Sequence, residues 1–122
     1  MQTDSEKFFL DILKGEKLSS VTFVMDYLQL EFDGNRFTLN VWPVVKVKNV
    51  NYKYEEQLYR DNLCSLIEKV VSALTYREAE ILILDFENGD SIAISLDRNN
   101  PDLNSPEIGV FTNTDEKCFV LE

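Results

Sequence analysis

The sequence contains no histidine, which removes the side chain that proteins use most often as a general base and as a metal ligand. A Ser–His or Cys–His nucleophile system therefore cannot be built from this chain alone. Its four glycines form neither a phosphate loop nor a dinucleotide-binding turn. We therefore predict a protein that is not an enzyme and that carries no transition metal and no organic cofactor.

Cysteine is also scarce. The two cysteines, Cys64 and Cys118, are far apart and match no metal-binding or redox spacing. Cys64 falls beside the apolar stripe of a predicted helix, and Cys118 opens a predicted strand. We expect two buried thiols, and a disulfide between them stays open as the alternative.

Long apolar runs are absent as well, since none approaches the roughly 18 residues that a membrane-spanning helix needs. Residues 1–17 place acids before a short apolar patch and so lack the basic first part of a signal peptide. We therefore expect a cytoplasmic protein. The 122 residues predict a single domain over 1–122, because this length suffices for one core but not for two.

Basic residues are few in the last third of the chain. The whole sequence has 22 acidic and 12 basic residues, yet residues 1–77 carry a net charge of only −1. Residues 78–122 carry −9, with Arg98 and Lys117 as their only basic residues. This charge argues against nucleic acid and against anionic membranes as partners. It leaves two interpretations, a soluble acidic surface or a site for a basic protein.

What the sequence does contain is two hairpin signals, and the first lies in residues 21–42. Two alternating apolar runs, Tyr27–Phe32 and Phe37–Val41, flank a turn sequence, Asp33-Gly34-Asn35-Arg36. Glycine and asparagine tolerate the positive φ of a tight turn, so a hairpin is predicted with all its apolar partners on one face. The predicted pairs are Phe32 with Phe37, Leu30 with Leu39, and Leu28 with Val41.

The alternation in residues 18–32 changes phase, which would place Asp26 on the core side of a single long strand. A lone buried carboxylate is costly, so we predict a bulge or sharp bend at Met25–Tyr27, with Asp26 bonded to the backbone there. A catalytic Asp26 is the alternative. Such a bend would curl the sheet into a half-barrel.

The second hairpin signal is residues 80–96, where Asn88-Gly89 favours a two-residue turn. The predicted pairs are Ile83 with Ile94, Asp85 with Ile92, and Ile81 with Leu96. On the other face, three large side chains (Leu82, Leu84, Phe86) would lie opposite three small ones (Ser91, Ala93, Ser95), which would leave room for a helix. Two short strands, Glu107–Thr112 and Cys118–Leu121, follow an Asx-rich loop.

Helical periodicity occurs in two places. Ser5–Lys14 predicts a short helix that ends at Gly15. Tyr52–Leu74 predicts a long helix whose apolar side chains recur every three or four residues, namely Leu63, Leu66, Ile67, Val70, Val71 and Leu74. The predicted fold is α+β, a mainly antiparallel sheet of about six strands with the long helix packed on it. We expect the two hairpins to be neighbours in that sheet and the helix to cover them.

Acidic side chains around the second turn and the loop after it, together with the sole tryptophan, are the candidates for partner binding. Two alternatives stay open, a pair of catalytic carboxylates at the turn and a calcium site in residues 97–102. The tryptophan is either covered by the N-terminal helix or part of a contact patch. The candidates are Asp85, Glu87, Asp90, Asp97, Asp102 and Trp42.

Two runs carry a resemblance to a known group of proteins. They are VTFVMDYLQLEFDG followed by WPVV, and LDFENGDSIAISL followed by PEIGVF. The second contains L-x-F-x-(D/N)-G-x-x-(I/L)-x-(I/V) at Leu84–Ile94, with Pro106-Glu107 after it. These runs resemble small uncharacterised bacterial single-domain proteins and the immunity proteins of contact-dependent toxin systems. Such proteins often have a tryptophan near the C-terminus, where this chain has Cys118-Phe119-Val120.

The resemblance implies a toxin-neutralising role and transfers no functional residue. Two functions are therefore carried forward. The first is a non-enzymatic protein-interaction module with an acidic surface. The second is a small-ligand-binding or carboxylate-based enzyme domain with a pocket inside a curled sheet. A pocket with apolar walls and a few converging polar groups would favour the second, and a flat acidic surface would favour the first.

Overall fold

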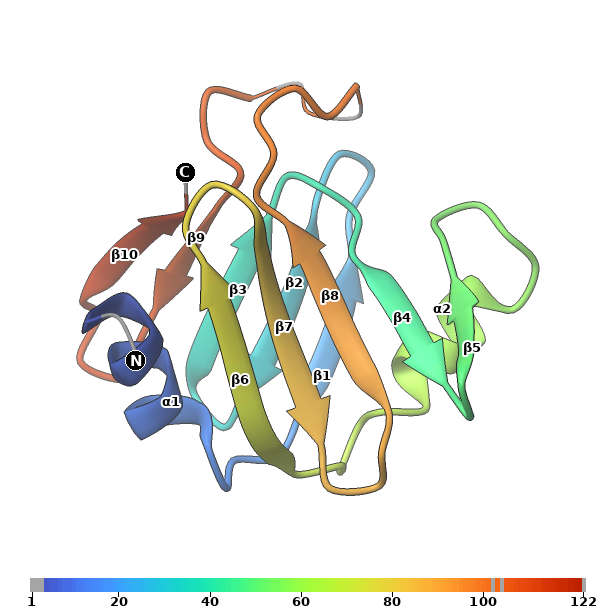
Figure 1. Ribbon diagram of the computed structural model, residues 1–122, viewed down its shortest axis with the longest axis horizontal. Coiled ribbons are helices and arrows are strands. Elements are labelled where there is room, and N and C mark those ends of the chain that lie inside the picture. The colour runs from blue at the N-terminus through green and yellow to red at the C-terminus, as the bar shows by residue number, and fades with distance from the viewer. Residues whose placement is uncertain (1–3, 102, 104, 122) are drawn as a thin grey trace.

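The computed structural model describes residues 4–101, 103 and 105–121, and it arranges their ten strands in two antiparallel sheets that share one core (Figure 1). Helix α1 spans Asp4–Leu13 and helix α2 spans Tyr59–Cys64. The strands are β1 (Ser20–Phe23), β2 (Leu28–Phe32), β3 (Asn35–Leu39), β4 (Val44–Val47), β5 (Val50–Tyr52), β6 (Val71–Arg77), β7 (Ile81–Phe86), β8 (Ser91–Ser95), β9 (Gly109–Thr112) and β10 (Cys118–Leu121). The mainly antiparallel α+β character is confirmed, whereas the long helix, the single sheet of about six strands and its curling into a half-barrel are not.

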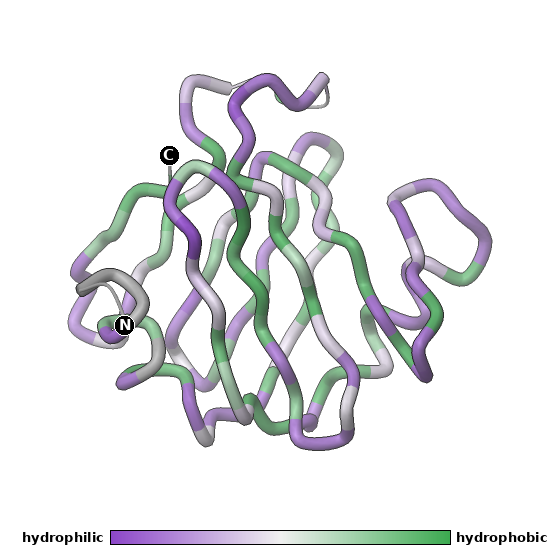
Figure 2. Tube along the Cα trace, viewed as in Figure 1, coloured by the Kyte–Doolittle hydropathy of each residue, from purple (hydrophilic) through white to green (hydrophobic). Residues whose placement is uncertain are grey.

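The first sheet has the strand order β1-β2-β3-β9-β10 and the second has β5-β4-β8-β7-β6. The chain passes from the first sheet to the second between β3 and β4, and it returns between β8 and β9. Side chains alternate between the core and the solvent, as in β2, where every second residue from Leu28 to Phe32 is buried. Figure 2 shows the same alternation of hydrophobic and hydrophilic residues along the strands.

The β2–β3 hairpin is confirmed, but its predicted register is wrong by two residues. Leu30 pairs with Phe37, and Phe32 pairs with Asn35. The turn is only two residues long, because Asp33 and Gly34 both have positive φ, 55° and 98°. That geometry matches the twist of the strands. Because the side-chain period of a strand is two, the shift leaves the same residues facing the core.

The β7–β8 hairpin differs from its prediction by one residue. Leu84 pairs with Ile92, and Asp85 pairs with Ser91. The Gly89 N–H donates to the Phe86 carbonyl (3.0 Å) and Gly89 has φ 93°, so the loop has three residues and not two. A one-residue slip moves partners to the opposite face. Large side chains therefore meet large ones in the core, and the small side chains of β8 face outward.

The helix predicted over Tyr52–Leu74 is wrong. The structure has a loop after β5, the six-residue α2, and then strand β6. A β-bulge between Val71 and Ala73 places Val71 and Leu74 on the core side, three residues apart, and this spacing imitates a helix. Glu68 has φ 80°, which no residue inside an α-helix adopts.

The expectation that the two hairpins are neighbours in one sheet is also wrong, because β2–β3 belongs to the first sheet and β7–β8 to the second. The first sheet, and not a helix, covers the inner face of β7–β8. The sharp bend at Met25–Tyr27 is confirmed as a complete reversal between β1 and β2, in which the Val24 N–H donates to the Tyr27 carbonyl (2.9 Å). Asp26 lies exposed at its tip, so no buried carboxylate arises.

Helix α1 is confirmed, and it closes one open edge of the two-sheet stack beside β6 and β10 (Figure 1). Phe9 is fully buried there, with ring centroids 5.0 Å from Phe119 and 5.4 Å from Phe111, both edge-on. We call this group the α1 cluster. Its members are Phe8, Phe9, Phe37, Tyr76, Phe111 and Phe119.

Candidate functional site

The acidic candidates do not form one spot. Glu87 and Asp90 lie at the turn between β7 and β8, and Asp97 lies beyond the opposite end of β8. Asp85 is half-buried on the outward face of β7, and Asp102 lies outside the described residues. The five strand residues of β8 separate the two ends by about 17 Å at the usual rise per residue.

Two of these acids have structural partners. The Asp90 carboxylate accepts hydrogen bonds from the backbone N–H of Lys48 (3.1 Å) and from the Asn88 side-chain amide (2.8 Å). The Asp97 carboxylate accepts from the backbone N–H of Asn99 (2.9 Å), which is a local Asx turn. Their positions are therefore explained by the turns they hold, and Glu87 keeps an exposed side chain.

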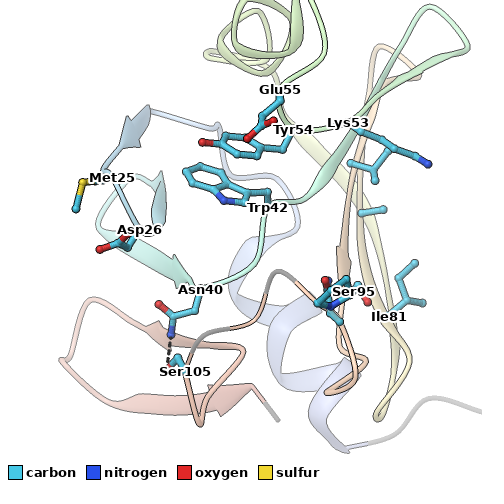
Figure 3. A pocket seen from close by; sticks show the side chains of 14 residues that line it. Met25, Asp26, Asn40, Trp42, Lys53, Tyr54, Glu55, Ile81, Ser95 and Ser105 are labelled. Atoms are coloured by element: carbon cyan, nitrogen blue, oxygen red, sulfur yellow. Dashed lines mark hydrogen bonds between the residues drawn. The ribbon is translucent and has the colours of Figure 1, made fainter.

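Trp42 lies in a different environment, on the connection from β3 to β4. Its ring is stacked on Tyr54, with centroids 4.0 Å apart and planes 4° from parallel (Figure 3). The Phe23 ring also stacks on Trp42, with ring centroids 6.4 Å apart. The guanidinium carbon of Arg60 lies 5.2 Å from the Phe23 ring centroid. Helix α1 does not cover Trp42, because α1 lies at the opposite edge of the sheets (Figure 1).

Tyr59, on α2, packs against Tyr54 and is bonded to the backbone next to Trp42. Its ring is buried and meets Tyr54 edge-on, with centroids 5.9 Å apart. Its hydroxyl donates a 2.5 Å hydrogen bond to the Pro43 carbonyl, next to Trp42 in the chain. Burial, with a smaller contribution from Tyr54, raises the pKa of Tyr59 well above its ordinary value, so the phenol stays a donor at neutral pH. We call Phe23, Trp42, Tyr54, Tyr59 and Arg60 the α2 cluster.

A cleft of about 900 Å³ opens beside Trp42. Both connections between the sheets line it, the first through Asn40 and Trp42 and the second through Asn100 and Ser105. Figure 3 shows Tyr54 on one side of the indole and Asn40 and Ser105 on the other. The remaining lining residues are Met25, Asp26, Val44, Lys53, Glu55, Ile81, Ala93, Ser95 and Pro101.

Hydrogen bonds hold the far wall of the cleft in place. The Asn40 side-chain amide nitrogen donates to the Ser105 hydroxyl (3.2 Å) and to the Glu107 carbonyl (3.0 Å). Both bonds use Nδ2 of Asn40, so its side-chain amide is held in one orientation on this wall.

The charged residues of the cleft are Asp26, Glu55 and Lys53. In Figure 3 the Lys53 side chain extends away from Trp42, whereas Glu55 lies against Tyr54. Glu55 also lines a second hollow of about 320 Å³, shared with Glu56, Leu58, Tyr59, Arg60 and Asp61. The two hollows adjoin at Glu55, and acidic side chains outnumber basic ones around them.

Each of the two hollows has one large, exposed apolar side chain among its lining residues. Met25 is 85% exposed at the rim of the cleft, and Leu58 is 52% exposed at the second hollow. Together with Tyr54, these are the residues that the sequence interpretation missed. Tyr54 and Leu58 fell inside the predicted long helix, and the exposure of Met25 depends on the β1–β2 turn. The lining residues that the sequence singles out are Trp42, as the sole tryptophan, and Asp26, as an alternative catalytic carboxylate.

The part of the chain that the structure describes contains no group of three or more Cys, Asp or Glu side chains placed to hold a metal ion. It also contains no helix long and apolar enough to cross a membrane. Cys64 and Cys118 are both free and exposed, so the prediction of two buried thiols is wrong. Partial burial and the nearby Asp61 raise the pKa of the Cys64 thiol, which makes it a poor nucleophile at neutral pH.

Comparison of the chain with protein-family models, with curated proteins and with solved structures finds no match.

Proposed function

We propose that this protein is a non-enzymatic protein-binding domain and that its binding surface is the cleft beside Trp42 with its rim. The observation that carries the proposal is the exposure of Met25 at the cleft that Trp42 and Tyr54 line, with Leu58 exposed at the second hollow. Aromatic residues and methionine are enriched in the centres of protein interfaces, and tryptophan, tyrosine and arginine dominate their binding energy. The α2 cluster contains all three of the latter.

The charge of this surface favours a basic partner. Asp26, Glu55, Glu56 and Asp61 line the two hollows, against Lys53 and Arg60. The protein as a whole has a net charge of −10, so its field attracts cations at long range. Such complementarity raises the rate of association and makes it depend on salt. The acids at the β7–β8 turn contribute to this field at a distance and lie outside the contact itself.

A basic toxin domain is the partner class that the resemblance to immunity proteins implies. An immunity protein acts by covering another protein, and it needs binding residues rather than a nucleophile or a cofactor. We place the protein in the cytoplasm, where two exposed thiols would stay reduced.

Capture of proteins from a cell extract on the immobilised domain tests the proposal. The bait variants are Trp42→Ala and Met25→Ser. The matched control is Val120→Ser, which removes another exposed apolar side chain (40% exposed) on β10, at the other edge of the sheets. We expect one basic protein to be retained by the original domain and the control and to be lost from both cleft variants. A set of captured proteins that is the same for all four baits would refute the proposal.

A second candidate function is favoured by the size of the cleft. Its 900 Å³ falls within the range of about 300–1,000 Å³ that is typical of small-molecule sites. In that case a small uncharged ligand would raise the melting temperature, and Trp42→Ala would abolish the rise. A thermal-shift screen of polar metabolites and saccharides distinguishes this function from protein binding.

A further inference from the structure

Building on the proposed function, we infer that the cleft receives an arginine side chain of the partner. Trp42 and Tyr54 are 4° from parallel, so they form one flat stack rather than a cage of perpendicular rings. A cage suits a round ammonium group, whereas a flat indole face suits a planar guanidinium that can stack on it.

One guanidinium of the protein already lies over a ring of the α2 cluster. Arg60 lies over the ring of Phe23 at 5.2 Å, within the range of cation–π contacts, and Phe23 in turn stacks on Trp42. This intramolecular pair shows that the aromatic group of this protein accepts arginine at a ring face. The indole side that is turned toward Asn40 and Ser105 lines the cleft (Figure 3).

The hydrogen-bonding groups around the cleft also fit arginine. Its guanidinium carries five N–H donors in a fixed plane and no acceptor. The cleft is lined by acceptors, among them the Asp26 carboxylate and, on the side of the indole away from Tyr54, the Asn40 side-chain oxygen. Lys53 is the one basic residue among the residues that line the cleft, and its side chain extends away from Trp42 (Figure 3). An anionic group would meet these same carboxylates and would be repelled.

Trp42 is the only tryptophan of the chain, so its fluorescence reports directly on occupancy of the cleft. The probes are nona-arginine and nona-lysine, which carry equal charge and differ in whether the cation is planar. At physiological salt we expect nona-arginine to change the Trp42 emission and to bind about tenfold more tightly than nona-lysine, since one good stacking contact corresponds to roughly that factor.

Two variants locate the binding site. Asp26→Asn removes a carboxylate from the cleft, and Glu87→Gln removes an exposed one from the turn of the β7–β8 hairpin. Both change the net charge equally, so only the first should weaken nona-arginine binding severalfold if the cation enters the cleft. Equal weakening by both variants would overturn the inference, because it would indicate attraction to the overall charge.

Two further outcomes separate this inference from the proposed function. If both peptides bind equally, or if neither changes the Trp42 emission, the arginine inference fails. The protein-binding proposal would then still stand or fall on the capture experiment with Trp42→Ala and Met25→Ser. If the captured partner keeps its affinity after each of its arginines at the interface is replaced with lysine, the inference fails while the proposed function survives.

Discussion

Each edge of the sheet stack carries an aromatic cluster under a helix, and the two clusters differ in how they are packed. In the α1 cluster, Phe9 is fully buried and makes mainly tilted or edge-on contacts to rings from both sheets. In the α2 cluster, Trp42 and Tyr54 are only half-buried, are stacked in parallel, and adjoin charged side chains. Both clusters are rich in aromatic residues, yet the α1 cluster is part of the buried core and the α2 cluster lines a cleft.

Aromatic residues therefore indicate a binding surface only when their faces remain accessible. Burial of a phenylalanine is repaid in folding stability, because its apolar area leaves water in the folded state. A half-exposed tryptophan contributes less to folding and keeps area that a partner can cover. The comparison therefore predicts that substitutions in the α1 cluster reduce stability and that those at the open part of the α2 cluster reduce binding.

The largest expected effect is that of Phe9→Ala. Removal of a fully buried ring should lower the free energy of unfolding by about 3–5 kcal/mol, through lost burial and the cavity left behind. Urea denaturation measures the change. Phe8→Ala is the matched control, since its neighbouring ring is only partly buried and should cost clearly less. Equal losses for the two would mean that α1 docks through a different face.

Tyr59→Phe should cost about 1–3 kcal/mol, because it leaves the buried Pro43 carbonyl without the hydroxyl that bonds to it. The same denaturation experiment measures it. Tyr54→Phe makes the same chemical change on a half-buried ring and should cost much less. A negligible effect of Tyr59→Phe would show that water reaches the Pro43 carbonyl and replaces the lost donor.

Alkaline pH should weaken the α2 cluster through the same residue. The pKa of Tyr59 in the folded protein lies above its ordinary value of 10.0, so between the two values the folded state binds the proton more tightly than the unfolded state. The resulting stability is fully present below pH 10 and is lost as the pH rises through the folded pKa. We expect a loss of about 1 kcal/mol over the first pH unit above 10. Tyr59→Phe should flatten this dependence, and an unchanged slope would contradict the assignment.

The smallest expected effect on stability is that of Trp42→Phe. The smaller phenylalanine ring can still stack on Tyr54, and the indole that it replaces is only half-buried. The free energy of unfolding should therefore fall by less than about 1 kcal/mol, as measured by thermal unfolding. Binding of the partner should nevertheless weaken. A stability loss as large as that of Phe9→Ala, with binding intact, would show that the two clusters have the same structural role and would erase the contrast.

The hairpins and α1 could be predicted because they depend on local signals. Asp33-Gly34 and Gly89 require positive φ, and a polar turn between alternating runs indicates a hairpin whatever the rest of the fold does. The exact registers could not be predicted, because Asn88-Gly89 fits both a two-residue loop and a three-residue loop that ends in a glycine bulge. Strand β6 resembles a helix in the sequence, because the bulge at Val71 changes the spacing of its buried residues from two to three.

The site could be predicted only in part, because the net charge of a sequence segment does not report where charges meet in space. The acid-rich residues 78–122 led to the β7–β8 turn, where Asp90 holds the backbone of Lys48. The acids around the cleft, among them Glu55, come from the nearly neutral first part of the chain. Among the lining residues, the sequence singles out Trp42, as the sole tryptophan, and Asp26, as an alternative catalytic carboxylate.

The position of the cleft has a consequence for how the two sheets separate. The connections that join the sheets are bonded to each other there, through the Asn40 N–H and the Ile108 carbonyl (2.8 Å) and through the Asn40 and Ser105 side chains. A partner seated on Trp42 would touch both connections at once. Its binding free energy would then oppose the opening of one sheet from the other, and amide hydrogen exchange in β3 and β8, which flank these connections, should slow together on binding.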